Sequence, residues 1–155
     1  MPKGNPEVIA ALNDILTAEL TSINQYFLHA EMCKDWGYET LYAHNRTEAI
    51  DEMKHAEELI ERVLYLKGLP NVQRLGKISI GESVPEQLRL DQNMEEEAVE
   101  RLNAAIAVCR DKADNGSREL LEKILVDEER HLDWLESQQD LIEQMGLENY
   151  LSTNA

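Results

Sequence analysis

Two short stretches of this chain carry the same arrangement of side chains: IDEMKH at residues 50–55 and DEERH at residues 127–131. In each stretch an aspartate precedes a glutamate, and a histidine follows the glutamate three positions later. The two copies are Asp51-Glu52-x-x-His55 and Asp127-Glu128-x-x-His131. Residues three apart on a helix lie on one face, so each copy predicts a carboxylate and an imidazole within reach of one metal ion. The repeat also predicts pseudo-two-fold symmetry between two helices.

Start and stop signals divide the chain into four long helices. Asn5 as an N-cap, Pro6 at the first helical position and Glu7 in the first turn begin the first helix, and Gly37 follows its end. The predicted helices run from Pro6 to about Trp36, from about Glu39 to Lys67, from Ser83 to about Lys112, and from Ser117 to Met145. The first two have roughly 30 residues each and a length of about 45 Å.

The connector at residues 68–84, GLPNVQRLGKISIGESV, lacks helical periodicity and contains three glycines and a proline. About 17 extended residues span up to roughly 56 Å, which is enough to cross the length of a helix. The tail LENYLSTNA at residues 147–155 predicts a short fifth helix, with a frayed terminus as the alternative. Short, long and short links between four amphipathic helices predict an all-α four-helix bundle.

Composition favours the same fold class. The 155 residues suit a single domain, 1–155, and seven Gly, four Pro and one Phe indicate helix rather than sheet. The formal charge of -16 would repel a phosphate backbone, which argues against nucleic-acid binding. The acidic surface either attracts cations or serves solubility.

The two cysteines, Cys33 and Cys109, lie in apolar helical patterns, which predicts free buried thiols and a reducing cytosol. No stretch approaches about 18 apolar residues, and the first ten residues do not resemble a signal peptide. We therefore expect a cytoplasmic protein that does not enter a membrane.

Each predicted helix places one glutamate in its apolar stripe when residues are plotted at about 100° per step. In the first helix Glu19 lies within the stripe Val8, Leu12, Ile15, Leu16, Ile23, Tyr26, Phe27 and Ala30. Glu52 and Glu128 lie in the second and fourth stripes, each followed by its histidine. In the third helix only Glu95 is in line with the apolar residues, and Glu96 and Glu97 point elsewhere.

Four carboxylates in one core need positive charge between them, because a buried carboxylate is costly and like charges repel. Two divalent cations would neutralise four carboxylates. Carboxylate oxygen with imidazole nitrogen, and no thiolate, favours iron or manganese, with zinc as a competitor. The predicted ligands are Glu19, Glu52, His55, Glu95, Glu128 and His131.

Antiparallel packing should bring these glutamates to one height. Glu19 and Glu52 are equidistant from residues 35–36, where the first hairpin turns. Glu95 and Glu128 are centred on residues 111–112, a few positions before Asn115-Gly116. We expect that the second turn comes early and that the fourth helix begins with a glycine; the alternative is that these two glutamates are not level.

At these residues the chain resembles the bacterioferritins, the haem-containing branch of the ferritins, whose ligand pattern in a helix bundle is already known. The resemblance runs through AELTSINQYFLHAEM (18–32), IDEMKHAEELIERVLYLKGLPN (50–71), LGKISIGE (75–82), DEERHLDWLE (127–136) and MGLENYL (145–151). It implies a ferritin-like bundle with a long crossover between the second and third helices and a short C-terminal fifth helix. It further implies a 24-subunit homo-oligomeric shell, built from dimers, that stores and detoxifies iron.

The resemblance also implies roles for single residues. The six predicted ligands would form a di-iron ferroxidase centre that oxidises Fe(II) to Fe(III) with dioxygen or peroxide. Tyr26 would assist electron transfer; a buried core tyrosine is the alternative. Met53 from two subunits would ligate one haem b, with an ordinary interface methionine as the alternative. A ferredoxin-type electron donor for iron release is a further implied partner.

One position departs from the family pattern. Thr47 stands where bacterioferritins often have a histidine that serves an inner-surface iron site with positions matching Asp51 and Asp127. These two aspartates either guide iron or are solvated surface acids. Two other classes stay open: a di-iron enzyme that acts on a small molecule or peroxide without storage, and a metal-free helical scaffold. Particle size and metal content distinguish them.

Overall fold

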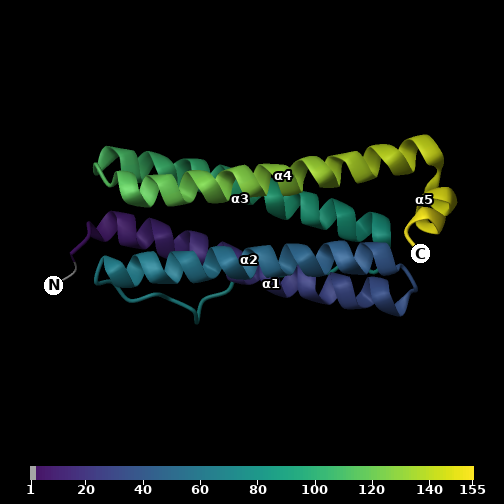
Figure 1. The fold of residues 1–155 in the computed structure, drawn as a ribbon, viewed down its shortest axis with the longest axis horizontal. Coiled ribbons are helices and arrows are strands. Elements are labelled where there is room, and N and C mark those ends of the chain that lie inside the picture. The colour runs from purple at the N-terminus through teal and green to yellow at the C-terminus, as the bar shows by residue number, and fades with distance from the viewer. Residues whose placement is uncertain (1–2) are drawn as a thin grey trace.

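The computed structural model describes residues 3–155, which form five helices and no strand. The helices are α1 (Pro6–Asp35), α2 (Glu39–Tyr65), α3 (Val84–Asp111), α4 (Asn115–Met145) and α5 (Leu147–Thr153). As Figure 1 shows, α1 and α2 form one hairpin and α3 and α4 form a second that lies along it. The predicted all-α bundle, its crossover and its fifth helix are confirmed. Within residues 3–155 no helix is long and apolar enough to cross a membrane.

Local capping sets the helix boundaries. The side chain of Asn5 accepts a hydrogen bond from the Glu7 N–H at 2.8 Å, as the sequence predicts. At the second turn the cap is Asp114, whose carboxylate accepts from the Ser117 N–H at 3.0 Å. The fourth helix therefore begins two residues before Ser117 and contains Gly116 in its first turn. The early turn is confirmed, and the predicted start at Ser117 is wrong.

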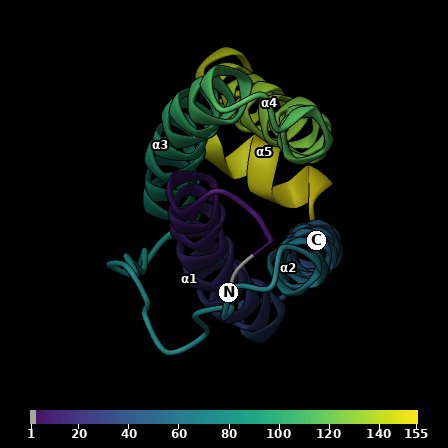
Figure 2. The same cartoon turned by 90° about the vertical axis from the view of Figure 1, so that its left-hand side faces the viewer.

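The crossover between α2 and α3 carries no helix or strand and lies beside α1 (Figure 2). Side chains on successive turns of α1 accept its backbone N–H groups: Thr21 Oγ1 from Gly76 at 2.8 Å, Gln25 Oε1 from Ser79 at 3.1 Å, and His29 Nε2 from Gly81 at 3.0 Å. Because each bond satisfies a backbone donor, this irregular segment can lie against the bundle at a defined height.

Two apolar clusters fill the bundle, one toward each end. The larger contains Leu12, Leu59, Leu102 and Leu121. The smaller contains Cys33 and is closed by Tyr150 of α5, whose hydroxyl donates to Gln138 at 2.7 Å. Cys33 and Cys109 are free and buried, as predicted.

One predicted core residue lies elsewhere. Phe27 is 52% exposed, because no other part of residues 3–155 packs over that side of α1. Neighbouring Leu28 is also exposed. The prediction that the apolar stripe of the first helix is buried along its whole length is therefore wrong for this chain alone.

Gly81 is expected to be intolerant of a side chain. A Cβ atom there would lie 2.5 Å from the backbone nitrogen of Gln87. We predict that Gly81→Ala destabilises the protein by about 1–3 kcal/mol, because crowding of this kind displaces packed segments. Denaturant unfolding followed by circular dichroism measures the loss. Ser79→Ala keeps the backbone N–H that bonds Gln25 and serves as the control; equal midpoints for both variants would contradict the prediction.

Candidate metal centre

One glutamate from each long helix reaches the interior at a common height. Glu19, Glu52, Glu95 and Glu128 are at most 2% exposed, and His55 and His131 are also buried. The structure therefore brings all six sequence-predicted ligands together. The four carboxylates meet between the two apolar clusters, so the centre is shielded from water along the bundle axis.

The six side chains form two groups that share a pair of glutamates. Glu19, Glu52, His55 and Glu128 make the first group, and Glu52, Glu95, Glu128 and His131 make the second. In each group the potential ligand atoms lie within 4.8 Å of one another. Glu52 and Glu128 belong to both groups, which is the arrangement that two neighbouring cations need when carboxylates lie between them.

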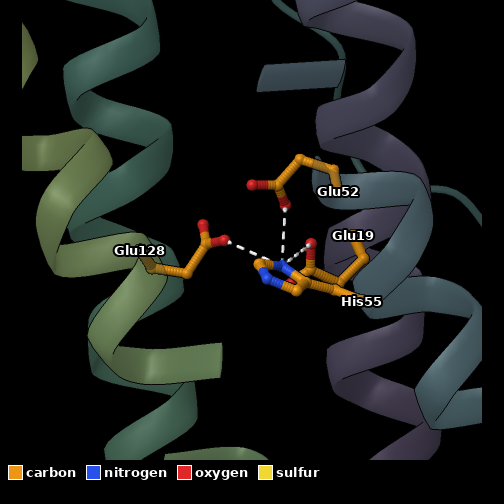
Figure 3. A group of neighbouring side chains, drawn as sticks. All are labelled: Glu19, Glu52, His55 and Glu128. Atoms are coloured by element: carbon orange, nitrogen blue, oxygen red, sulfur yellow. Dashed lines mark ion pairs between the residues drawn. The ribbon is translucent and has the colours of Figure 1, made fainter. Parts of the chain in front are cut away.

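Both histidines direct the Nδ1 atom inward. His55 Nδ1 lies 3.2 Å from a Glu128 oxygen, 3.5 Å from a Glu19 oxygen and 4.0 Å from a Glu52 oxygen, as drawn in Figure 3. His131 Nδ1 lies 3.1 Å from Glu52, 3.6 Å from Glu95 and 3.8 Å from Glu128. Each histidine thus contacts glutamates of both helix hairpins, and all six side chains share one buried site.

Several atoms that face the centre have no hydrogen-bond partner of good geometry within residues 3–155. They are Glu19 Oε2, both oxygens of Glu52, Glu95 Oε2, both oxygens of Glu128, and the Nδ1 atoms of His55 and His131. Buried polar atoms are normally paired, and each unpaired one costs free energy. Metal ions between these atoms would satisfy them together, so the donor set fits a pair of cations.

Further carboxylates contact the outward-facing nitrogens of both histidines. His55 Nε2 lies 2.9 Å from Asp127, and His131 Nε2 lies 2.5 Å from Glu48 and 3.6 Å from Asp51. Each histidine is therefore contacted by an acid from the opposite hairpin, which fixes its ring orientation. Asp51 and Asp127 are 37% and 36% exposed in their side chains, and each carboxylate also contacts one histidine of the centre.

Sequence reasoning missed Glu48. It lies one helical turn before Glu52 and therefore on the same face of α2, which was the available signal. Burial raises its pKa, but the close contacts with His131 and His44 outweigh that effect and lower the pKa to about 2. Glu48 is therefore ionised and available as an acceptor at neutral pH. Thr47 is exposed, and its hydroxyl donates to the Ala43 carbonyl of its own helix.

Tyr26 is both buried and in contact with the centre. Its hydroxyl donates to Glu95 Oε1 at 2.7 Å, and its ring meets that of His131 edge-on at 6.5 Å. Burial, followed by the charge of Glu95, raises the pKa of Tyr26 well above its usual value. The phenol is therefore a neutral donor that holds one of the predicted ligands.

Without cations, the ionised carboxylates of the centre are disfavoured by burial and by repulsion from one another. Burial and neighbouring carboxylates raise the pKa values of Glu52 and Glu95. Burial alone would lower the pKa values of the histidines, but contacts led by Glu128 for His55, and by Glu48 for His131, raise both to about 11. The pocket therefore favours any positive charge, whether protons or metal ions.

The sequence comparisons agree with this geometry. Residues 9–145 match the family described as a ferritin-like domain. Bacterioferritin of Mycobacterium tuberculosis is 49% identical over 148 residues, which cover 96% of this chain and 93% of the relative. The chain belongs to the bacterioferritins. Two further relatives are similar: bacterioferritin of Streptomyces coelicolor, 52% identical over 97% of this chain and 90% of the relative, and bacterial ferritin of Synechocystis sp., 46% identical over 97% of each.

Met53, which the bacterioferritin resemblance singled out, lies outside the cluster. It is on the outer side of α2 and is 55% exposed. Ile50 and Leu64 are also exposed large apolar side chains on this helix. The thioether is therefore accessible from outside the chain.

The raised pKa values predict how the metal-free bacterioferritin chain responds to pH. His55 and His131 titrate near 11 when folded and near 6.5 when unfolded, so their stabilisation is complete below pH 6.5 and is lost as the pH rises toward 11. The raised pKa values of Glu52 and Glu95 act in the same direction. We expect the melting temperature in chelator to fall between pH 6.5 and 9.

Zinc-loaded protein is the matched comparison for this pH series. Its bound metal replaces the protons, so the fall should be smaller than in the chelated sample. A chelated sample whose melting temperature stays constant or rises over the same range would contradict the expected protonation of the centre.

Proposed function

We propose that this chain stores iron and that it oxidises Fe(II) to Fe(III) at the centre between its four long helices. One observation carries the proposal: two groups of buried ligands share Glu52 and Glu128, and most of their inward oxygens lack partners. The donor set, carboxylate and imidazole without thiolate, suits iron. Membership of the bacterioferritins supports the same substrate.

The proposed ligand roles follow the two groups. Glu19 and His55 would bind one ion, and Glu95 and His131 would bind the other. The shared glutamates, Glu52 and Glu128, would lie between the ions and fix their separation. Holding two ions side by side in a pocket of excess negative charge favours the higher charge of Fe(III) and therefore its formation.

The electron balance sets what the protein must supply. Two Fe(II) ions give up two electrons. With two protons these electrons reduce one dioxygen to hydrogen peroxide, or, with two protons again, one hydrogen peroxide to two water molecules. The proposed part of the protein is to bind both ions beside one oxidant. Tyr26, which touches Glu95, is proposed to assist electron transfer.

Storage of iron in a shell requires many copies of the chain to assemble. Exposed apolar side chains support such an assembly. Phe27 and Leu28 on α1, and Ile50, Met53 and Leu64 on α2, are large apolar residues open to solvent in the single chain. Such residues gather where copies of a protein meet. We propose a 24-subunit shell built from dimers, as the family resemblance implies; a ferredoxin-type donor for iron release stays a prediction.

The oxidation depends on the shared glutamates. We predict that Glu128→Ala abolishes the ferric absorbance that appears when protein loaded anaerobically with Fe(II) meets air, because both proposed ions lose a ligand. Glu129→Ala is the matched control, since Glu129 is exposed on the next position of α4. A Glu128→Ala protein that oxidises Fe(II) as fast as the control would exclude this centre.

Particle size separates storage from a di-iron enzyme without storage. Gel filtration and electron microscopy of the same sample should give a large hollow particle. A compact monomer or dimer that still oxidises Fe(II) would retain the proposed centre and remove the storage function.

We further propose that Met53 ligates a haem b shared by two copies of the chain. Its exposed thioether among exposed apolar side chains supports this, because a haem packs against apolar surface and methionine is one of the side chains that serve as its axial ligand. Thioether ligation favours ferrous haem and would supply a group of raised potential for electron transfer to stored iron.

The visible spectrum tests the haem. Met53→Leu should keep the fold and lose the haem absorbance, because leucine preserves volume but cannot ligate iron. Met94→Leu on α3 is the control and should bind haem normally. An unchanged spectrum in the Met53→Leu protein would rule out this ligation.

A further inference from the structure

The two histidines of the centre are held from outside in different ways. Asp127 contacts His55, and its second oxygen pairs at 2.9 Å with Arg130, a side chain that is mostly exposed. Glu48 contacts His131 and is itself buried. A surface ion pair contributes little, whereas removing one partner of a buried pair is costly because it leaves the other charge buried and uncompensated. The two histidines are therefore supported differently, His55 by the partly exposed Asp127 and His131 by the buried Glu48.

Behind Glu48 stands an aromatic pair that joins α2 to α4. His44 Nε2 lies 3.0 Å from Glu48 Oε1, and the His44 ring stacks on Trp134 with ring centroids 3.4 Å apart and planes 14° from parallel. The other oxygen of Glu48 contacts His131. Trp134, His44, Glu48 and His131 thus form a closed chain that starts on α4, crosses to α2 and returns to α4.

Helix geometry explains why this chain closes. His44 and Glu48 are four residues apart on α2, and His131 and Trp134 are three apart on α4, so each pair lies on one face of its helix. The two helices have little backbone contact with each other. Side chains must therefore set the distance between α2 and α4. The stacked rings of His44 and Trp134 connect the two helices next to His131.

We propose that His44 is a positioning residue. Clamped against Trp134, it holds the Glu48 carboxylate, which in turn holds the His131 ring with Nδ1 directed into the centre. The His131 half is thereby preorganised and binds its metal ion more tightly than the His55 half. This inference rests on the proposed dinuclear centre and concerns the order in which its two halves fill.

Cobalt(II) tests the inference without iron oxidation, because its visible absorption reports each binding step. Titration of the metal-free full-length protein should give two ions per chain in two steps. His44→Ala should weaken the tighter step by roughly tenfold or more, since groups behind metal-bound histidines typically contribute that much to affinity. The weaker step should be unchanged.

Two further substitutions separate the stack from the contact with Glu48. His44→Phe keeps an aromatic ring against Trp134 and loses the nitrogen, so it should weaken the tighter step as His44→Ala does. His44→Gln keeps a donor for Glu48 and should restore part of the affinity. Because His44 acts through Glu48, adding His44→Ala to Glu48→Gln should cause no further loss. Asp127→Asn should instead weaken the other step.

The spectroscopic signature is the N–H proton of each cobalt-bound imidazole. Its strongly shifted NMR signal should broaden for His131 and not for His55 in His44→Ala, which a general loss of stability would not produce. Two cobalt steps unchanged in all three His44 variants would overturn the positioning role and leave the proposed centre intact. A wild-type protein that binds no cobalt would overturn both.

Discussion

The structure depends on the burial of four carboxylates at one level of a helix bundle. Glu19, Glu52, Glu95 and Glu128 cannot share that space as free anions, since each has lost its hydration and each repels the others. In the metal-free chain the two histidines offset this charge by holding protons to about pH 11. The same imbalance gives cations their affinity for the centre, so the cost to stability and the proposed function have one origin.

Much of the surrounding structure keeps these carboxylates level. The crossover runs the length of the bundle so that α2 and α3 are parallel and the second hairpin brings Glu95 and Glu128 beside the first pair (Figure 1). Gln25 and His29, which accept the crossover N–H groups, also contact Asp91 at 2.8 and 2.9 Å. Asp91 lies one turn from Glu95 on α3. The crossover, α1 and α3 are therefore tied together next to a proposed ligand.

The six inner ligands follow the pseudo-two-fold symmetry of the two hairpins, but the acids that contact the histidines from outside do not. Both Glu-x-x-His motifs direct histidine Nδ1 inward, yet His55 is contacted from outside by the partly exposed Asp127, whereas His131 is contacted by the buried Glu48 as well as by the partly exposed Asp51. An internal repeat thus yields two unequal halves. Inequality of this kind would let the two ions of the proposed centre bind one after the other, because two identical sites would fill over the same range of metal concentration.

Helical periodicity and capping signals were enough to predict the bundle, the crossover and the six inward residues, because burial of an apolar stripe leaves each helix only one orientation. The same signals placed the start of α4 at Ser117. In the structure Asp114 is the N-cap instead, so the helix begins at Asn115. They also assigned Phe27 to the core, since periodicity does not say which part of a stripe finds a partner. The contact of Glu48 with His131, the stack of His44 on Trp134 and the pairing of Asp127 with His55 join residues from 72 to 90 positions apart. Such contacts depend on the distance and rotation between α2 and α4, which no local pattern encodes and which only the packed bundle establishes.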